Sequence, residues 1–227
     1  MTVGLRLTKA IAPFAEASGF RYISKRGTFV RKETHGFSEF LLMTYPTVVD
    51  GALGQHYELA AGVRHDVVEQ VVNQLGLVYG SEYQSATTTV LTSPDRFPLT
   101  PGNQYTWFLP NAASERDVQD VAGAVASCLT AELLSYFARY ASLQECSTGL
   151  NSSPESRSHP LYNKPEPRMY RAITAAHLCG EANFGTLVEG WLKAYPMTVP
   201  SNEQANVRDR LPRLLSILGV FLTPKSE

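Results

Sequence analysis

Residues 114–145 read SERDVQDVAGAVASCLTAELLSYFARYASLQE, and this stretch decides the second half of the fold. Its apolar side chains recur every three or four residues, the spacing that gives a helix one apolar face. Ser114 and Asp117 have the spacing of a capping box, in which each side chain accepts a hydrogen bond from a backbone N–H that the first turn leaves unpaired. We therefore predict a long helix after Ser114, with a bend near Gly123 or Ser135 because a straight helix of this length exceeds the width of a compact domain.

The spacing of apolar residues is different on the N-terminal side of this helix. Apolar and polar residues alternate over 56–63, which predicts a half-buried strand. Two runs rich in aromatic and β-branched residues, 20–24 and 28–33, are joined by Lys25-Arg26-Gly27 as in a hairpin. Residues 37–45 (FSEFLLMTY) are apolar on both faces, as in a strand inside a sheet. Further strands are expected over 87–92 and 104–109, and helices over 5–15 and 65–75.

On the C-terminal side, residues 147–167 are rich in Ser, Asn and Pro and predict an exposed loop. Helical spacing then returns in three segments, 168–179, 181–195 and 201–218. These patterns predict an α+β protein with a mostly antiparallel sheet in the N-terminal half, covered by helices, and an all-helical C-terminal part. The expected division is an α+β domain over 1–146, the loop over 147–167, and a helical extension over 168–227 that packs on the first part.

Charge and cysteine content limit the classes of partner and compartment. The chain has 20 basic and 21 acidic residues, whereas proteins that coat DNA or membrane surfaces carry a basic excess. Its three cysteines, Cys128, Cys146 and Cys179, are odd in number and widely spaced, which does not suit a disulfide framework and favours a reducing compartment.

The N-terminal residues resemble a signal peptide only in the small residues Ala15-Glu16-Ala17. The stretch before them is interrupted by Arg6, Lys9 and Pro13, so no continuous apolar segment precedes this site. No later segment reaches the roughly 18 apolar residues of a membrane span. We therefore expect a soluble cytoplasmic protein without membrane contact.

Short strings in the first 145 residues carry a family resemblance. They are Gly19-Phe20, the basic hairpin Gly27-Thr28-Phe29-Val30-Arg31 and the acidic helix start from Ser114 to Asp120. In this order they resemble a loose group of uncharacterised bacterial proteins classed as a domain of unknown function. Because such proteins are often suspected to be immunity or accessory proteins, the resemblance implies a binding role, and it supplies no catalytic residue.

Motifs of common enzyme chemistry are missing from the sequence. It contains no G-x-x-x-x-G-K-[ST] loop, no G-x-G-x-x-G after a strand, and no G-x-S-x-G turn. No H-x-x-x-H or C-x-x-C pair occurs, so we expect no metal site and no cofactor. The five histidines are His35, His56, His65, His159 and His177.

A polar cluster around His56 and Glu58 is the place to look for an enzyme site. These two residues, with the following His65 and Asp66, would do acid–base chemistry if they met in a pocket. The alternative interpretation is that His56 and Glu58 form the solvent side of a strand, and that Asp66 caps the next helix.

The basic hairpin is the most distinctive charge feature. Positions 21 to 32 hold Arg21, Lys25, Arg26, Arg31 and Lys32, interleaved with aromatic residues. Such a surface suits an acidic protein partner or the phosphates and bases of a nucleic acid. It equally suits an edge hairpin that its charges keep soluble and unpaired.

We predict a non-enzymatic protein-binding factor, of the immunity or accessory kind, whose partner contacts the hairpin and the strand 56–64. The residues assigned to this surface are Arg21, Lys25, Arg26, Arg31, Lys32, His56 and Glu58. The alternatives are a nucleic-acid-associated protein that uses the same hairpin, and an enzyme with its site near His56 and Glu58. The sequence leaves the oligomeric state open.

Overall fold

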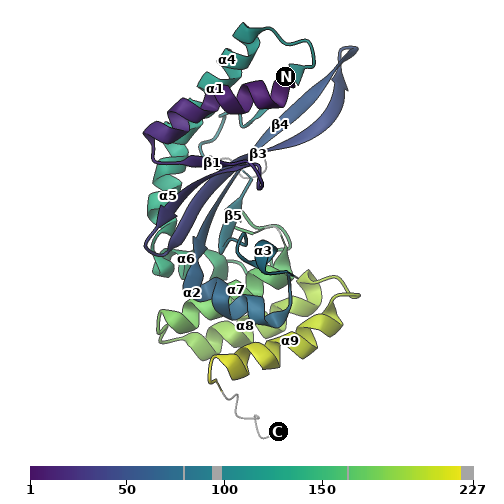
Figure 1. Ribbon diagram of the computed structural model, residues 1–227. Coiled ribbons are helices and arrows are strands. Elements are labelled where there is room, and N and C mark those ends of the chain that lie inside the picture. Colours follow the sequence, from purple (N-terminus) through teal and green to yellow (C-terminus); the bar gives the residue numbers. More distant parts are fainter. Residues whose placement is uncertain (79, 94–98, 163, 221–227) are drawn as a thin grey trace, which may run out of the picture. The chain divides into compact units, whose positions relative to one another are not determined.

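The computed structural model describes residues 1–78, 80–93, 99–162 and 164–220, and in these ranges the strands form one six-stranded antiparallel sheet (Figure 1). The strands are β1 (Arg21–Ile23), β2 (Thr28–Glu33), β3 (Gly36–Val49), β4 (Ala52–His65), β5 (Val90–Thr92) and β6 (Thr106–Pro110). The order is β1-β2-β3-β4-β5, and β6 pairs with β4. With helices in the rest of the chain, this confirms the predicted α+β class.

The chain divides into two compact units. The first unit comprises Met1–Val63 and Leu91–Arg139, and the second comprises Arg64–Val90 and Tyr140–Glu227. Each unit is therefore built from two separate stretches of sequence, and the segment 64–90 belongs with the C-terminal helices. Of the second unit, residues 79, 163 and 221–227 lie outside the described ranges.

Three helical elements complete the first unit. They are α1 (Val3–Ala17), α4 (Glu115–Cys128) and α5 (Leu134–Tyr140), with the π-helical turn η2 (Leu129–Leu133) between the last two. The predicted capping box is present, because the Ser114 hydroxyl accepts from the Asp117 N–H at 3.2 Å and the Asp117 carboxylate accepts from the Ser114 N–H at 2.7 Å. The departure from α-helical geometry lies at η2, between the two expected bend positions.

An aromatic cluster joins these helices to the sheet. Phe29 and Phe40, paired across β2 and β3, stack with ring centroids 4.8 Å apart. Phe20 contacts Phe40 at 5.3 Å and Phe137 of α5 at 5.4 Å. The face of the sheet that carries Phe29 and Phe40 is therefore the face that the helices cover.

The helix over Glu115–Tyr140 is also, in the described ranges, the one helix long and apolar enough to cross a membrane. Of its most apolar stretch, 56% is buried inside the protein. Such burial is typical of a core helix, so this element is compatible with a soluble protein.

The second unit is helical. Its longer helices are α2 (Asp66–Val72), α6 (Leu143–Asn151), α7 (Pro165–Leu178), α8 (Phe184–Thr198) and α9 (Gln204–Ile217), and its short ones are η1 (Asn73–Leu75) and α3 (Ser81–Gln84). Helix α7 is the central one, since it packs on α2, α6, α8 and α9. Its Arg171 forms a buried two-pronged ion pair with Glu69 of α2, at 2.8 and 2.7 Å.

The stretch expected as an exposed loop, 147–167, includes the end of α6 and the beginning of α7. Between them, His159 and Leu161 are buried. The buried guanidinium of Arg168 donates to the carbonyl oxygens of Ser153, Pro154 and Ser156 at 3.1 to 3.2 Å. These bonds tie the connection to α7, which explains how a segment rich in Ser and Pro lies against the helices.

Candidate functional site

The two strands that form the middle of the sheet are longer than their neighbour β2, and this leaves an unpaired strand edge. β2 pairs with β3 from Gly36 to Phe40 only, whereas β3 continues to Val49. Among the described strands, none pairs with β3 on this side beyond Phe40. β3 is therefore central near its beginning and an edge strand from Leu41 onward.

Backbone alternation identifies the groups that this free edge presents. The carbonyl of Phe40 accepts from the Thr28 hydroxyl of β2 at 2.9 Å, so the backbone groups of Phe40 face β2. Since these groups alternate sides along a strand, those of Leu42, Thr44 and Pro46 face the free edge. Pro46 has no N–H, and a proline on the unpaired side of a strand is typical of an edge.

A groove of about 490 Å³ lies along this edge, entirely within the first unit. Its walls are α1, the turn between β1 and β2, and the β3 residues from Leu41 to Thr44. Apolar side chains at its rim are solvent-exposed, with Leu5 46% and Tyr22 37% exposed. The groove thus combines a backbone edge with apolar walls.

Tyr57 of β4 lines the groove and is 2% exposed. Its hydroxyl is buried and has no hydrogen-bond partner among the residues that the structure describes. A Cβ built on Gly4, in the first turn of α1, would lie 3.5 Å from this oxygen, so the hydroxyl lies directly beside the helix start. Burial raises the pKa of Tyr57, so its hydroxyl keeps its proton and remains a donor.

The N-terminal end of α1 forms part of the same wall. Thr2 caps the helix, with its hydroxyl accepting from the Leu5 N–H at 3.4 Å. The first turn contains no acidic residue to offset the partial positive charge of the helix end. Thr2, Gly4 and Leu5 all line the groove, and no acidic residue is among its described lining residues.

Two of the predicted site residues take part in contacts within the first unit. Arg26 lines the groove, pairs with Glu39 and lies with its guanidinium carbon 4.9 Å from the ring centre of Phe37. Arg31 pairs with Glu33 at 2.5 Å and lies 4.9 Å from the ring centre of Phe20, on the helix-covered face. Of these two, Arg26 is the one that the structure places at the groove.

The other predicted residues lie elsewhere. Arg21, Lys25 and Lys32 are exposed. Arg21 is opposite Val30, so Arg21 and Lys32 point away from the helix-covered face. His56 and Glu58 flank Tyr57 in β4, and therefore point to the face opposite the groove.

The strand order separates the two parts of the predicted surface. β3 lies between β2 and β4, so the hairpin and the strand 56–64 are not neighbours. Glu58 is buried rather than solvent-facing. Asp66 does not cap α2: no side chain caps that helix, and Asp66 pairs instead with Arg64 at 2.6 Å.

In the second unit, His65 is buried, and its Nε2 lies 2.8 Å from the carbonyl oxygen of Tyr140. No group of three or more His, Cys, Asp or Glu residues with metal-binding geometry occurs within the described ranges. The buried histidine is therefore engaged in a structural contact.

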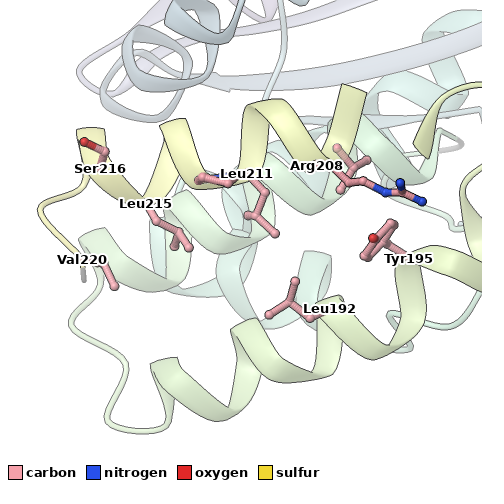
Figure 2. Close-up of a pocket in the computed structure, with 9 residues that line it drawn as sticks. Leu192, Tyr195, Arg208, Leu211, Leu215, Ser216 and Val220 are labelled. Atoms are coloured by element: carbon pink, nitrogen blue, oxygen red, sulfur yellow. The ribbon is translucent and has the colours of Figure 1, made fainter. Parts of the chain in front are cut away.

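A second hollow lies in the second unit between α8 and α9, with a volume of about 440 Å³ (Figure 2). Figure 2 shows Tyr195 and Arg208 near one end and Ser216 and Val220 near the other, with Leu211 between them. The lining is mainly apolar, which suits an apolar group but holds no set of reactive side chains.

Sequence reasoning missed most of the groove because its walls come from separate segments. The alternation over 56–63 predicted the strand that carries Tyr57, but the surroundings of its hydroxyl depend on Gly4 of α1. The available signal was a difference in length between two neighbouring strands. The run 28–33 is short, whereas the apolar run that begins at Phe37 is longer than this partner can cover.

A scan against models of known protein families, a search of curated proteins and a search of solved structures gave no match. The resemblance of residues 1–145 to uncharacterised bacterial proteins therefore remains a prediction.

Proposed function

We propose that the chain is a non-enzymatic protein-binding factor, of the immunity or accessory kind, which accepts an extended segment of its partner along the free edge of β3. The observation that carries this proposal is the unpaired edge from Leu41 onward beside a groove with apolar walls. In strand addition, backbone hydrogen bonds supply affinity and pockets for alternate side chains supply specificity. Here the free edge of β3 offers the backbone hydrogen bonds, and the groove offers a pocket for a side chain.

Exposed apolar residues on the same β-hairpin support a protein partner. Tyr45, Val48, Val49 and Leu53, near the turn between β3 and β4, are 47%, 60%, 40% and 61% exposed. Exposed apolar side chains gathered near one turn are typical of contact sites. A partner strand on the edge would extend the sheet and cover part of this surface.

The nucleic-acid alternative has less support from the hairpin. Arg26 and Arg31 form ion pairs with Glu39 and Glu33, so two of the five basic residues are already engaged with carboxylates. The enzyme alternative requires His56 and Glu58 to line a pocket, and it has less support because both residues point away from the groove. Protein binding is the function that the geometry supports best.

The test is a display screen of random extended peptides on the purified protein, followed by fluorescence polarisation and amide hydrogen exchange. Binding should slow exchange at Leu42 and Thr44, whose N–H groups face the free edge, and leave Met43 and Tyr45 unchanged, because theirs face β4. If no peptide binds, or if bound peptides leave exchange at Leu42 and Thr44 unchanged, the proposal is wrong.

A pair of variants at one position separates backbone from side-chain effects. Thr44→Pro removes the edge donor and should weaken peptide binding at least tenfold, whereas Thr44→Val keeps the N–H and should bind like the wild type. Circular dichroism and thermal melting establish that both variants are folded.

A further inference from the structure

The groove beside β3 has a chemical preference that the strand edge alone does not supply. We infer that it selects a partner strand carrying an acidic side chain, whose carboxylate accepts hydrogen bonds from the Tyr57 hydroxyl and the first turn of α1. This inference rests on the proposed function and specifies the partner's chemistry.

The first support is the Tyr57 hydroxyl itself. It is buried, lines the groove and has no hydrogen-bond partner within the described part of the chain. Buried polar groups in folded proteins are nearly always hydrogen-bonded, and an exception at a groove marks a position where a ligand group completes the pairing. Burial raises its pKa, so the hydroxyl keeps a proton that it can donate to an acceptor of the ligand.

The second support is the helix end. The N-terminal N–H groups of a helix lack partners within the helix and carry partial positive charge, which favours a carboxylate. In α1 the Thr2 hydroxyl accepts from Leu5, and the backbone of the first turn, at Gly4, lies beside the Tyr57 hydroxyl. The helix end and the hydroxyl therefore converge on one point of the groove.

The third support is the sign of the surrounding charge. No acidic residue is among the described lining residues. Arg26 also lines the groove, but its guanidinium pairs with Glu39 and lies over Phe37, on the other face of the sheet, so the helix end and Tyr57 supply the attraction. A lysine or an apolar residue at the same place in the partner strand would leave these donors unpaired.

The experiment uses four blocked eight-residue peptides in which Val and Thr alternate and one central residue is Asp, Asn, Ala or Lys. Fluorescence polarisation measures their affinity for the wild type, Tyr57→Phe and Gly4→Ala. The wild type should bind the Asp peptide at least tenfold more tightly than the Ala peptide. Tyr57→Phe should reduce this preference to threefold or less.

Gly4→Ala is an independent probe of the same point. An added methyl group would lie 3.5 Å from the hydroxyl oxygen and occupy space directly beside it, so the preference for Asp should fall as in Tyr57→Phe. Tyr83→Phe, at an exposed tyrosine of the second unit, is the matched control and should keep the full preference.

The possible outcomes distinguish the acidic preference from the proposed binding of a partner strand. If the four peptides bind equally and slow exchange at Leu42 and Thr44, strand addition stands and the acidic preference is overturned. An Asp preference that survives in Tyr57→Phe also overturns it. If none of the four binds and the display screen is empty as well, the proposed function fails.

Discussion

His159 is a buried histidine whose surroundings require the neutral ring. The Leu161 N–H donates to its Nδ1 at 3.2 Å, and its Nε2 lies 3.0 Å from the Ser152 hydroxyl. A proton on Nδ1 would oppose the Leu161 N–H. Burial, together with the charge of Arg168, lowers the pKa of His159 to about 4.

This shift gives the second unit an acid sensitivity with a defined direction. Since the unfolded chain binds a proton near pH 6.5 and the folded one only near pH 4, stability present above pH 6.5 is lost as the pH falls between these values. The loss is at most about 3 kcal/mol. Chemical denaturation from pH 7.5 to 4 should show a smaller loss in His159→Gln than in the wild type; equal slopes would contradict this.

The ion pair between Glu69 and Arg171 is the most deeply buried charge contact that the structure shows, with side chains 0% and 3% exposed. Thr89 also donates to the Glu69 carboxylate, at 3.2 Å. Arg171→Met would leave this carboxylate buried and without its cation, so we expect a loss of about 3–5 kcal/mol in the free energy of unfolding.

Two comparisons in urea denaturation test the cause. Arg213→Met, at an exposed arginine of the same unit, should change stability by less than about 0.5 kcal/mol. The double variant Glu69→Leu/Arg171→Met should recover much of the loss, because no lone charge remains buried. A double variant as unstable as Arg171→Met would show that packing, not charge, dominates.

At the scale of elements, the start of α4 is the feature that sequence and structure describe identically. The reciprocal bonds of Ser114 and Asp117 satisfy two N–H groups of the first turn. Ser114→Ala should lower stability by about 1 kcal/mol, measured by thermal melting, while Ser127→Ala on the exposed side of the same helix should have little effect. Equal effects would mean that the cap contributes nothing.

Elements whose residue pattern is local could be predicted from the sequence. Strand alternation and helical spacing are local, and they located β1, β2, β4, α1 and the start of α4 correctly. The helix expected over 114–145 ends at Tyr140, and a separate helix, α6, begins at Leu143. The predicted helical segment 201–218 corresponds to α9, which begins at Gln204 with Glu203 as its cap residue. Its proline, Pro212, lies within one helix from Gln204 to Ile217.

β3 shows where local pattern stops being sufficient. Its apolar residues on both faces indicated a central strand, and from Gly36 to Phe40 this is correct. Beyond Phe40 the same composition belongs to an edge strand, because the antiparallel β2 begins only at Thr28 and has no residues that could pair with the rest of β3. Whether an apolar strand has one neighbour or two depends on the length of another segment, which its own residues do not encode. The candidate groove follows from this difference and was not predicted.

At the scale of the whole molecule, each unit depends on two distant parts of the sequence. Helix α2, from the segment 64–90, supplies Glu69 to α7 of the C-terminal segment. A fragment of residues 140–227 would contain α7 without this carboxylate and without the apolar side chains of Val68 and Val72. We expect it to lack a cooperative unfolding transition in circular dichroism.

The comparison is with the intact chain, in which the transition should be cooperative. Adding a peptide of residues 64–90 to the fragment should restore helical signal in part, because it returns α2. A fragment that unfolds as sharply as the intact protein would contradict the dependence on this segment.

Pro46 limits how long a partner strand stays on the proposed edge. In the described part of β3, the outward N–H groups beyond Phe40 are those of Leu42, Thr44 and Val48, and Pro46 interrupts the row. Each hydrogen bond contributes about 0.5–1.5 kcal/mol net, and differences in affinity reside mainly in the dissociation rate. So short a ladder releases its strand readily, which suits a factor that exchanges partners and not one assembled for the life of the protein.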